Sequence, residues 1–203
     1  MKKLLVATRN VGKLKEISSF LSGLPFKIIS LFKIGINGDF EETGKTYQEN
    51  SRAKALFYSK KSGLPTIADD GGIEITALKG APGIKSRRWF GKFSTDEEIL
   101  KRMLNISKKL TKNNRVAFFK TVISLALPSG KVWSVPGEVK GIIAEKPYLR
   151  LLKGYPYRSF FYLPRLKKYY HEDQLTKEEE KEYNHRYKAI RKLIPIIRQE
   201  LIS

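Results

Sequence analysis

Residues 4–20 read LLVATRNVGKLKEISSF, and this opening indicates the class of fold. The apolar run at residues 4–7 predicts a buried strand, and the polar residues after it, which include Gly12, predict a loop. Apolar residues then recur at helical spacing as far as Gly23, and residues 26–31 resume a strand pattern. A strand, a loop, a helix and a second strand in succession are typical of an α/β fold.

Length and composition point to one folded domain. The 203 residues, 41% hydrophobic and 30% charged, can bury a core without disulfides and carry too much charge for a membrane-embedded protein. We expect a single domain over residues 1–203, with two closely joined lobes rather than independent domains. No apolar window is long enough to span a bilayer and the short basic start lacks a signal-peptide pattern, so we expect a cytoplasmic protein without a membrane partner.

Counts of individual residue types exclude several chemistries. Zero cysteines exclude a thiol nucleophile, a Cys-ligated metal and a disulfide, and two histidines, His171 and His185, cannot form a three-histidine metal site. The 40 Lys and Arg against 20 Asp and Glu leave a formal net charge of +20. This charge predicts attraction to polyanions such as nucleotides, nucleic acid or anionic lipid, without naming a reaction.

The next part of the chain predicts two helices and a strand region. Residues 46–63 predict a helix that starts with capping-box spacing, and Ser94 with Glu97 predicts the capped start of another. Between them, residues 66–77 have strand patterns, and we expect an acidic turn at residues 69–72 to separate two strands.

The second half of the chain predicts an antiparallel pair followed by irregular structure. Residues 116–127 and 132–143 have strand patterns, and the Pro-Ser-Gly-Lys sequence between them predicts a hairpin turn. We expect Pro136 and Gly137 to interrupt the second strand region. The basic and aromatic residues 146–170 show no single period, so we expect mostly loop there. A last amphipathic helix begins at residues 178–180, and Pro195 is expected to kink or split it.

The first loop has the parts of an anion site. Asn10 can act as a polar clamp, Gly12 permits close approach to a helix N-terminus, and Lys13 supplies a positive charge. A structural cap is the competing interpretation, because the loop lacks the Walker pattern.

Two acidic pairs could serve a metal ion. Asp69 and Asp70 precede two glycines, and Glu41 and Glu42 follow a glycine-rich stretch. Together they could bind Mg²⁺, which needs only one or two carboxylates besides water and substrate phosphates. Ordinary acidic turns and loops are the competing interpretation.

Four motifs occur in order along residues 1–145. The first, T-x-N-x-x-K, contains Thr8, Asn10 and Lys13. The other three are close to E-x-G-x-T-[FY]-x-E-N, A-D-D-S-G-[LI] and G-x-P-G-[VI]-x-S-x-R, and they contain Glu42, Gly44, Thr46, Tyr47, Glu49 and Asn50, residues 68–73, and Gly80, Pro82, Gly83, Ile84, Ser86 and Arg88. In their order and spacing these motifs resemble the inosine triphosphate pyrophosphatase family, and the resemblance is weaker beyond residue 145.

The resemblance implies a fold and a reaction. The fold would be an elongated two-lobed α/β structure with a twisted mixed central sheet and a cleft between the lobes, usually in a homodimer. The reaction would be Mg²⁺-dependent hydrolysis of non-standard purine nucleoside triphosphates such as ITP, dITP and XTP between the α- and β-phosphates. The products would be the monophosphate and pyrophosphate. The reaction would remove non-standard nucleotides from the cellular pool.

The resemblance also implies roles for particular residues. Glu41 and Asp70 would hold the metal, and Asp70 would act as the catalytic base. Substrate binding would fall to Thr8, Asn10, Lys13, Gly71, Tyr155, Arg158, Lys181, His185 and Arg186. Supporting positions would be Glu49, Asn50, Lys54, Asp69, Ser86 and Arg88.

The second half departs from the family where the base is read. The family segment G-F-G-Y-D-P corresponds to residues 154–159, so that Arg158 replaces an acid while Tyr155 keeps an aromatic ring. The family lysine that precedes S-H-R corresponds to Glu180, with Lys181 adjacent. An arginine prefers acceptors such as O6 and N7 of a purine, or a phosphate, which places the base specificity in question.

Two alternatives follow from these departures. One is a pyrophosphatase with altered base specificity. The other is an inactive, family-derived nucleic-acid-binding protein that uses the basic and aromatic residues 146–170 for stacking and phosphate contacts.

Overall fold

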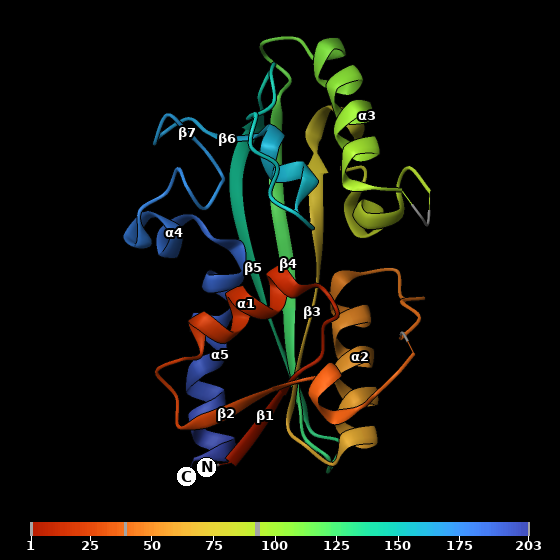
Figure 1. Ribbon diagram of the computed structural model, residues 1–203, viewed down its shortest axis with the longest axis vertical. Helices are drawn as coiled ribbons and strands as arrows, with labels where there is room; N and C mark the ends of the chain where they lie inside the picture. The colour runs from red at the N-terminus through yellow and green to blue at the C-terminus, as the bar shows by residue number, and fades with distance from the viewer. Residues whose placement is uncertain (1, 39, 92–93, 203) are drawn as a thin grey trace. The chain divides into compact units, whose positions relative to one another are not determined.

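The computed structural model describes residues 2–38, 40–91 and 94–202 (Figure 1). Strands and helices combine in a mixed α/β fold whose seven-stranded sheet has the order β2-β1-β3-β4-β5-β6-β7. The strands are β1 Lys2–Val6, β2 Phe26–Ser30, β3 Thr66–Ile75, β4 Val116–Ala126, β5 Val132–Ile143, β6 Phe161–Leu163 and β7 Lys168–Tyr169. The α-helices are α1 Val11–Phe20, α2 Tyr47–Ser62, α3 Asp96–Lys109, α4 Lys177–Tyr183 and α5 His185–Leu201.

The sheet contains both strand directions. β1 runs parallel to β2 and to β3, with Leu5 of β1 beside Thr66 of β3. β6 runs antiparallel to β5 and to β7, with Tyr162 of β6 opposite Tyr169 of β7. The mixed α/β class expected from the sequence is therefore confirmed.

The chain folds into two compact units. Unit 1 contains Met1–Asp70, Thr121–Gly137 and Arg186–Ser203, and unit 2 contains Gly71–Lys120 and Glu138–His185. The buried apolar side chains form clusters that belong to one unit or the other. Each unit therefore has a core of its own.

The core of unit 1 has three layers because the side chains of β1 alternate between the two faces of the sheet. Leu4 and Val6 are fully buried in one cluster with Ile17 of α1 and with Leu193 and Ile197 of α5. Leu5 and Ala7 are fully buried in a second cluster with residues of α2, namely Ala55 and Tyr58. Burying a side chain of this size stabilises the fold by about 1.5 to 3 kcal/mol, so β1 anchors both helical layers.

The core of unit 2 lies between α3 and one face of its strands. Ile99 and Met103 of α3 are buried with Phe119 of β4 and with Phe161 and Leu163 of β6. The side chains that alternate with these strand positions are half-buried, and three of them are Phe118, Ile142 and Tyr162. The strands of unit 2 thus have a second face that is less buried than the face against α3.

The expectation of an acidic turn at residues 69–72 is wrong. Asp69 and Asp70 lie inside β3, which continues through Gly71 and Gly72 to Ile75. The second glycine is required by close approach rather than by a turn. A Cβ atom on Gly72 would lie 2.3 Å from the carbonyl oxygen of Gly83 and 2.3 Å from Ser86 Oγ.

Residues 146–170 are mostly loop, as expected, and also contain β6, β7 and a short 3-10 helix, Pro156–Phe160. Two further expectations are corrected. The cap of α3 is Thr95, whose side chain and that of Glu98 form the capping box predicted one residue earlier. α5 continues through Pro195, and the break lies at Asn184, between α4 and α5.

The long strands β4 and β5 are confirmed. The interruption expected at Pro136 and Gly137 is wrong, because β5 is continuous through both residues. Within the described ranges, no helix has the length and apolar character needed to cross a membrane.

Candidate active site

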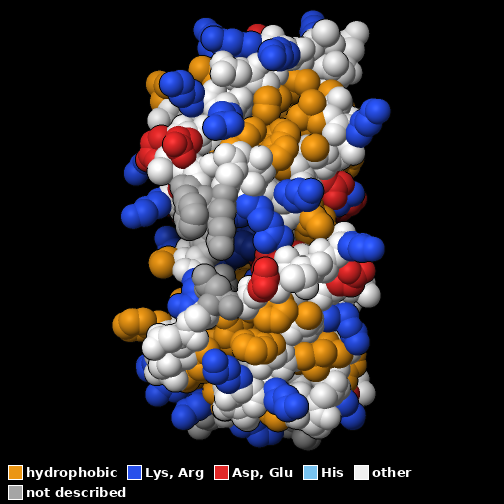
Figure 2. Space-filling view, turned by 90° about the vertical axis from the view of Figure 1, so that its right-hand side faces the viewer, with side chains coloured by type: hydrophobic (Ala, Val, Ile, Leu, Met, Phe, Trp, Pro, Cys, Tyr) orange, Lys and Arg blue, Asp and Glu red, His pale blue; other side chains and the backbone are white. Residues whose placement is uncertain are grey.

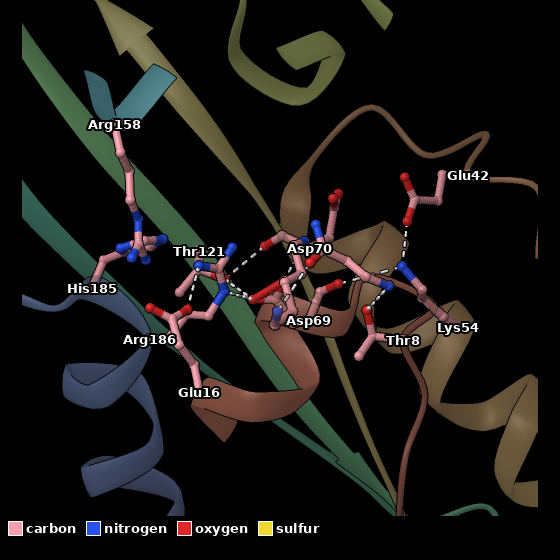
Figure 3. Close-up of polar contacts among 12 residues, drawn as sticks. Thr8, Glu16, Glu42, Lys54, Asp69, Asp70, Thr121, Arg158, His185 and Arg186 are labelled. Carbon is pink, nitrogen blue, oxygen red and sulfur yellow. Dashed lines mark hydrogen bonds and ion pairs between the residues drawn. The ribbon is translucent and has the colours of Figure 1, made fainter. Parts of the chain in front are cut away.

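Asp69 is the centre of a dense polar network in unit 1 (Figure 3). Its side chain is buried and accepts hydrogen bonds from three elements. Lys13 Nζ of α1 lies 2.5 Å from Oδ2, Arg186 Nε of α5 lies 2.9 Å from Oδ1, and the Thr121 hydroxyl of β4 lies 2.8 Å from Oδ1. Burial alone would raise the pKa of Asp69, but the charges of Arg186 and Lys13 outweigh it and hold the pKa well below its ordinary value. Asp69 is therefore a permanent anion.

Asp70, the next residue on β3, has the opposite electrostatic environment. It is 5% exposed, and Asn50 Nδ2 of α2 donates to its Oδ2 at 2.9 Å. Burial and the negative charge of Glu42 outweigh this hydrogen bond and raise the pKa of Asp70 to about 6. A carboxylate with a pKa near the working pH is suited to accept a proton. Of the two adjacent aspartates, Asp70 is therefore suited to be a general base, whereas Asp69 stays ionised and binds cations.

Asn50 holds Asp70 in place through a tight turn before α2. Its Oδ1 accepts the backbone N–H of Gly44 at 2.7 Å while its Nδ2 reaches Asp70. A Cβ atom on Gly44 would lie 2.6 Å from this oxygen, which explains why a glycine occupies this position. The predicted supporting position Glu49 is exposed and accepts the backbone N–H of Lys45 at 2.7 Å, so it stabilises the same turn.

The two glutamates before α2 differ in their surroundings. Glu42 forms an ion pair with Lys54, and Lys54 Nζ also lies 3.3 Å from the backbone oxygen of Asp69. Burial opposes the charged form of Lys54, but the charge of Glu42 outweighs it and raises the pKa of this lysine. Glu41, the residue predicted to bind metal, is exposed. The carboxylate that acts on the pKa of Asp70 is therefore that of Glu42.

The first loop positions Lys13 by capping α1. Asn10 is the N-cap, and its Oδ1 accepts the backbone N–H of Lys13 at 3.0 Å. The Thr8 hydroxyl in turn accepts the backbone N–H of Asn10 at 3.2 Å. Asn10 thus caps α1, and Lys13 of the same motif reaches the carboxylate of Asp69.

Two residues of the centre were missed by sequence reasoning. Thr121 also lies 3.0 Å from the backbone oxygen of Asp70, and Glu16 Oε2 accepts from Arg186 Nη1 at 3.1 Å. Each had a signal. Thr121 is a polar residue within a buried apolar strand, and Glu16 follows Lys13 by three residues, which places both on one side of α1. Arg186, predicted to bind substrate, is buried between two carboxylates.

Unit 2 contains a separate cationic and aromatic cluster. The guanidinium carbon of Arg158 lies 4.1 Å from the ring centre of Tyr155 and 4.4 Å from that of Tyr170. The Tyr170 hydroxyl lies 2.9 Å from His185 Nδ1, and the His185 ring stacks on Phe119 with centres 5.3 Å apart. Arg158 is 3% exposed and His185 is 1% exposed. Three of the predicted substrate-binding residues, Tyr155, Arg158 and His185, are thus gathered in one unit.

The remaining predicted residues of unit 2 lie elsewhere or act structurally. Ser86 is buried, and its hydroxyl accepts the backbone N–H of Ile73 at 3.0 Å and donates to the Gly83 carbonyl at 2.6 Å. Arg88 and Lys181 are exposed. Gly71 is half-buried and directly follows Asp70.

The fold and the centre in unit 1 define the class of protein, which is an α/β enzyme with buried aspartates surrounded by cations. Comparison with known proteins then gives the family. The sequence model of the Ham1 family matches residues 4–196. The chain belongs to the Ham1 family and is a hydrolase, which confirms the resemblance drawn from the motifs.

Individual relatives agree with this assignment. A dITP/XTP pyrophosphatase of Geobacter sulfurreducens is 39% identical over 163 residues, which cover 80% of this chain and 81% of that protein. A dITP/XTP pyrophosphatase of Thermus thermophilus is 38% identical over 192 residues, which cover 95% and 90%. The solved structure of a HAM1 protein from Coxiella burnetii matches with a TM-score of 0.82 at 33% identity, covering 98% of this chain and 100% of that one.

Proposed function

We propose that the protein hydrolyses the non-standard purine nucleoside triphosphates ITP, dITP and XTP to the monophosphate and pyrophosphate, as a house-cleaning enzyme of the nucleotide pool. The observation that carries the proposal is the pair of adjacent buried aspartates on β3, surrounded by Lys13, Lys54 and Arg186. The names of the relatives support the substrate class.

The residues of unit 1 have complementary roles in this proposal. Lys13 and Lys54 are half-buried cations that can neutralise charge on the phosphate oxygens of the substrate. Asp69 and Glu16 hold Arg186 in place, and Asp69 also holds Lys13. Asp70 takes a proton from the attacking water, for which a pKa raised to about 6 is suited.

The carboxylates next to Lys54 fit a divalent cation. The charge of Glu42 raises the pKa of Asp70, which is the repulsion that a cation between carboxylates would relieve. Among the described residues no group of three or more His, Cys, Asp or Glu side chains could hold a metal, so water and substrate phosphates would complete the shell. We propose Asp70 and Glu41 as the ligands of Mg²⁺ because the family resemblance implies them. The repulsion described above acts between Asp70 and Glu42, and Glu42 also pairs with Lys54. When bound, the ion would neutralise phosphate charge and help to orient water.

A matched pair of variants tests the choice between the two glutamates. Glu41→Gln should raise the Mg²⁺ concentration needed for half-maximal hydrolysis, with less effect on the rate at saturating Mg²⁺. Glu42→Gln should lower the rate even at saturating Mg²⁺, because Lys54 loses its partner. The opposite pattern would assign the metal to Glu42.

A second candidate function is a pyrophosphatase with altered base specificity, and Arg158 favours it. A buried guanidinium held between two tyrosine rings presents donors where the related family segment has an acid. A panel of triphosphates separates this candidate from the first. Preference for a substrate other than ITP, dITP and XTP, changed by Arg158→Asp, would support altered specificity.

The site of attack can be measured directly. Hydrolysis in water labelled with ¹⁸O should place one label in the monophosphate if water attacks the α-phosphorus. Label in the pyrophosphate, or release of orthophosphate, would contradict the proposed reaction. We further propose a homodimer and a cytoplasmic location, where the triphosphate pool is found. Sedimentation and localisation of a tagged chain test these two points.

A further inference from the structure

Three tyrosines in unit 2 form a row on the less buried face of its strands. Tyr162 of β6 and Tyr169 of β7 oppose each other, with ring centres 5.3 Å apart. Tyr148, which follows β5, lies with its ring centre 5.3 Å from that of Tyr169. We call these three residues the tyrosine row. All three are half-buried, whereas Phe161 and Leu163 of the same hairpin are buried in the core against α3.

Hydrogen bonds fix the orientation of the row. The Tyr148 hydroxyl donates to Asp173 at 3.0 Å, and Gln174 donates to the same hydroxyl at 3.2 Å. The Tyr169 hydroxyl donates to the backbone oxygen of Lys146 at 3.0 Å. The rings are therefore held in place at their hydroxyl ends. Held rings lose little conformational freedom when a flat ligand stacks on them.

The segment that carries the row is strongly basic. Arg150 pairs with Asp173 at 3.2 Å, with 74% of its side chain still exposed, and Lys168 pairs with Glu179 at 2.7 Å. Residues 146–170 contain seven Lys and Arg residues and no Asp or Glu, and the seven are Lys146, Arg150, Lys153, Arg158, Arg165, Lys167 and Lys168. Five of them are exposed, namely Lys146, Arg150, Lys153, Arg165 and Lys167. By contrast, Figure 2 shows Lys and Arg side chains scattered among Asp and Glu over another face. Exposed cations beside held aromatic rings suit a ligand with both negative charges and flat rings.

We propose that the tyrosine row and its flanking cations bind single-stranded nucleic acid, with bases stacked on the rings and phosphates at Lys146 and Arg150. Aromatic rings on the open face of an antiparallel sheet are a common platform for unpaired bases. A second copy of this chain is a less suitable occupant, because a two-fold contact would bring these cations against their own copies. The tyrosine row contains none of the residues assigned above to hydrolysis or to base recognition, so the two kinds of binding can be tested separately.

Fluorescence anisotropy with a labelled single-stranded oligonucleotide tests the proposal. The double variant Tyr162→Leu/Tyr169→Leu should weaken binding by about tenfold or more, because each stacked base contributes substantially. Tyr162→Phe/Tyr169→Phe keeps both rings and should bind as the wild type does. An oligonucleotide of equal length with abasic sites should bind the wild type as weakly as the intact one binds the leucine variant.

Salt dependence tests the phosphate contacts. Lys146→Gln/Arg150→Gln should reduce the slope of log affinity against log salt by about 1.4, because each contact to a single strand contributes about 0.7. Lys60→Gln/Lys61→Gln removes the same charge from exposed positions of α2 and should leave the slope unchanged. Pyrophosphate release should be unaffected by the tyrosine variants, which separates this binding from hydrolysis.

Three results would overturn the proposal. The first is equal binding of the intact and abasic oligonucleotides, which would indicate charge attraction alone. The second is a loss of affinity in Lys60→Gln/Lys61→Gln as large as that in Lys146→Gln/Arg150→Gln. The third is a dimer that dissociates in the leucine variant, which would identify the row as a contact between copies of the chain.

Discussion

Replacing Asp70 by asparagine is expected to abolish hydrolysis and also to stabilise the metal-free protein at pH 8. Asp70 is 5% exposed. Burial and the nearby negative charge of Glu42 both disfavour the ionised form of its carboxyl group. Asparagine has nearly the same shape and no charge, and its carbonyl oxygen can accept the hydrogen bond that Asn50 donates. The variant therefore removes the proposed base together with an unfavourable charge.

The size and the pH window of this effect follow from the pKa. The pKa of Asp70 is raised from 3.8 to about 6 in the folded protein. A rise of about two units corresponds to about 3 kcal/mol, which is an upper limit because the new amide also needs an acceptor. Between pH 4 and pH 6 the Asp70 carboxyl group is protonated in the folded state and ionised in the unfolded state. The free energy of unfolding of the wild type therefore falls as the pH rises from about 4 to about 6. The gain from Asp70→Asn should be about 1 kcal/mol at pH 4.5 and about 3 kcal/mol at pH 8.

Asp69→Asn is the matched control. It makes the same substitution at the neighbouring residue, and the expected change in unfolding free energy has the opposite sign. It removes the anion that pairs with Lys13 and Arg186, and Arg186 is 4% exposed. Breaking a buried ion pair from one side costs about 3 to 5 kcal/mol. Asp69→Asn should therefore destabilise the protein at pH 8, where Asp70→Asn stabilises it.

Urea unfolding in EDTA at pH 4.5 and pH 8 measures both variants against the wild type. Adding Mg²⁺ at pH 8 should narrow the gap between the wild type and Asp70→Asn, because the ion would stabilise only the protein that binds it. An Asp70→Asn variant that is less stable than the wild type in EDTA at pH 8 would refute the reasoning. So would a difference in stability that does not change between the two pH values.

Three further predictions concern single contacts. Thr121→Val should cost about 1.5 to 3 kcal/mol of unfolding free energy in a urea titration, since Asp69 loses a hydrogen bond to a buried charge. Arg158→Asp should shift the ratio of kcat/KM values toward ITP in a substrate panel, and an unchanged ratio would remove Arg158 from base reading. Gly72→Ala should lower the melting temperature because its Cβ would lie 2.3 Å from a backbone oxygen, whereas Gly23→Ala, with nothing within 4 Å, should not.

The sequence was most informative where a local pattern determines structure. Residues 4–20 predicted the strand, loop and helix that the structure contains, because apolar spacing and a capping asparagine act locally. The motifs also named Lys13, Asn50, Lys54 and Asp69, which the structure gathers around Asp70. These residues belong to the motifs, or closely follow the motifs, on which the resemblance rests.

Contacts between distant segments were less accessible to sequence reasoning. The two glycines after Asp70 suggested a turn, but Gly72 is required by the approach of Ser86. Thr121 reaches Asp69 because β4 lies beside β3, and Glu16 of α1 joins the centre because it contacts Arg186 of α5. No local sequence pattern encodes these contacts between distant segments. The irregular aromatic spacing of residues 146–170 suggested loop, since β6 and β7 are too short to show a period.

Pyrophosphate release with Mg²⁺ from ITP, dITP, XTP and the ordinary triphosphates, measured beside Asp70→Asn, tests the central claim most directly. We predict selective release of pyrophosphate from the non-standard purines by the wild type and none by the variant. Release at the wild-type rate by Asp70→Asn, or no release from any triphosphate by the wild type, would contradict the account.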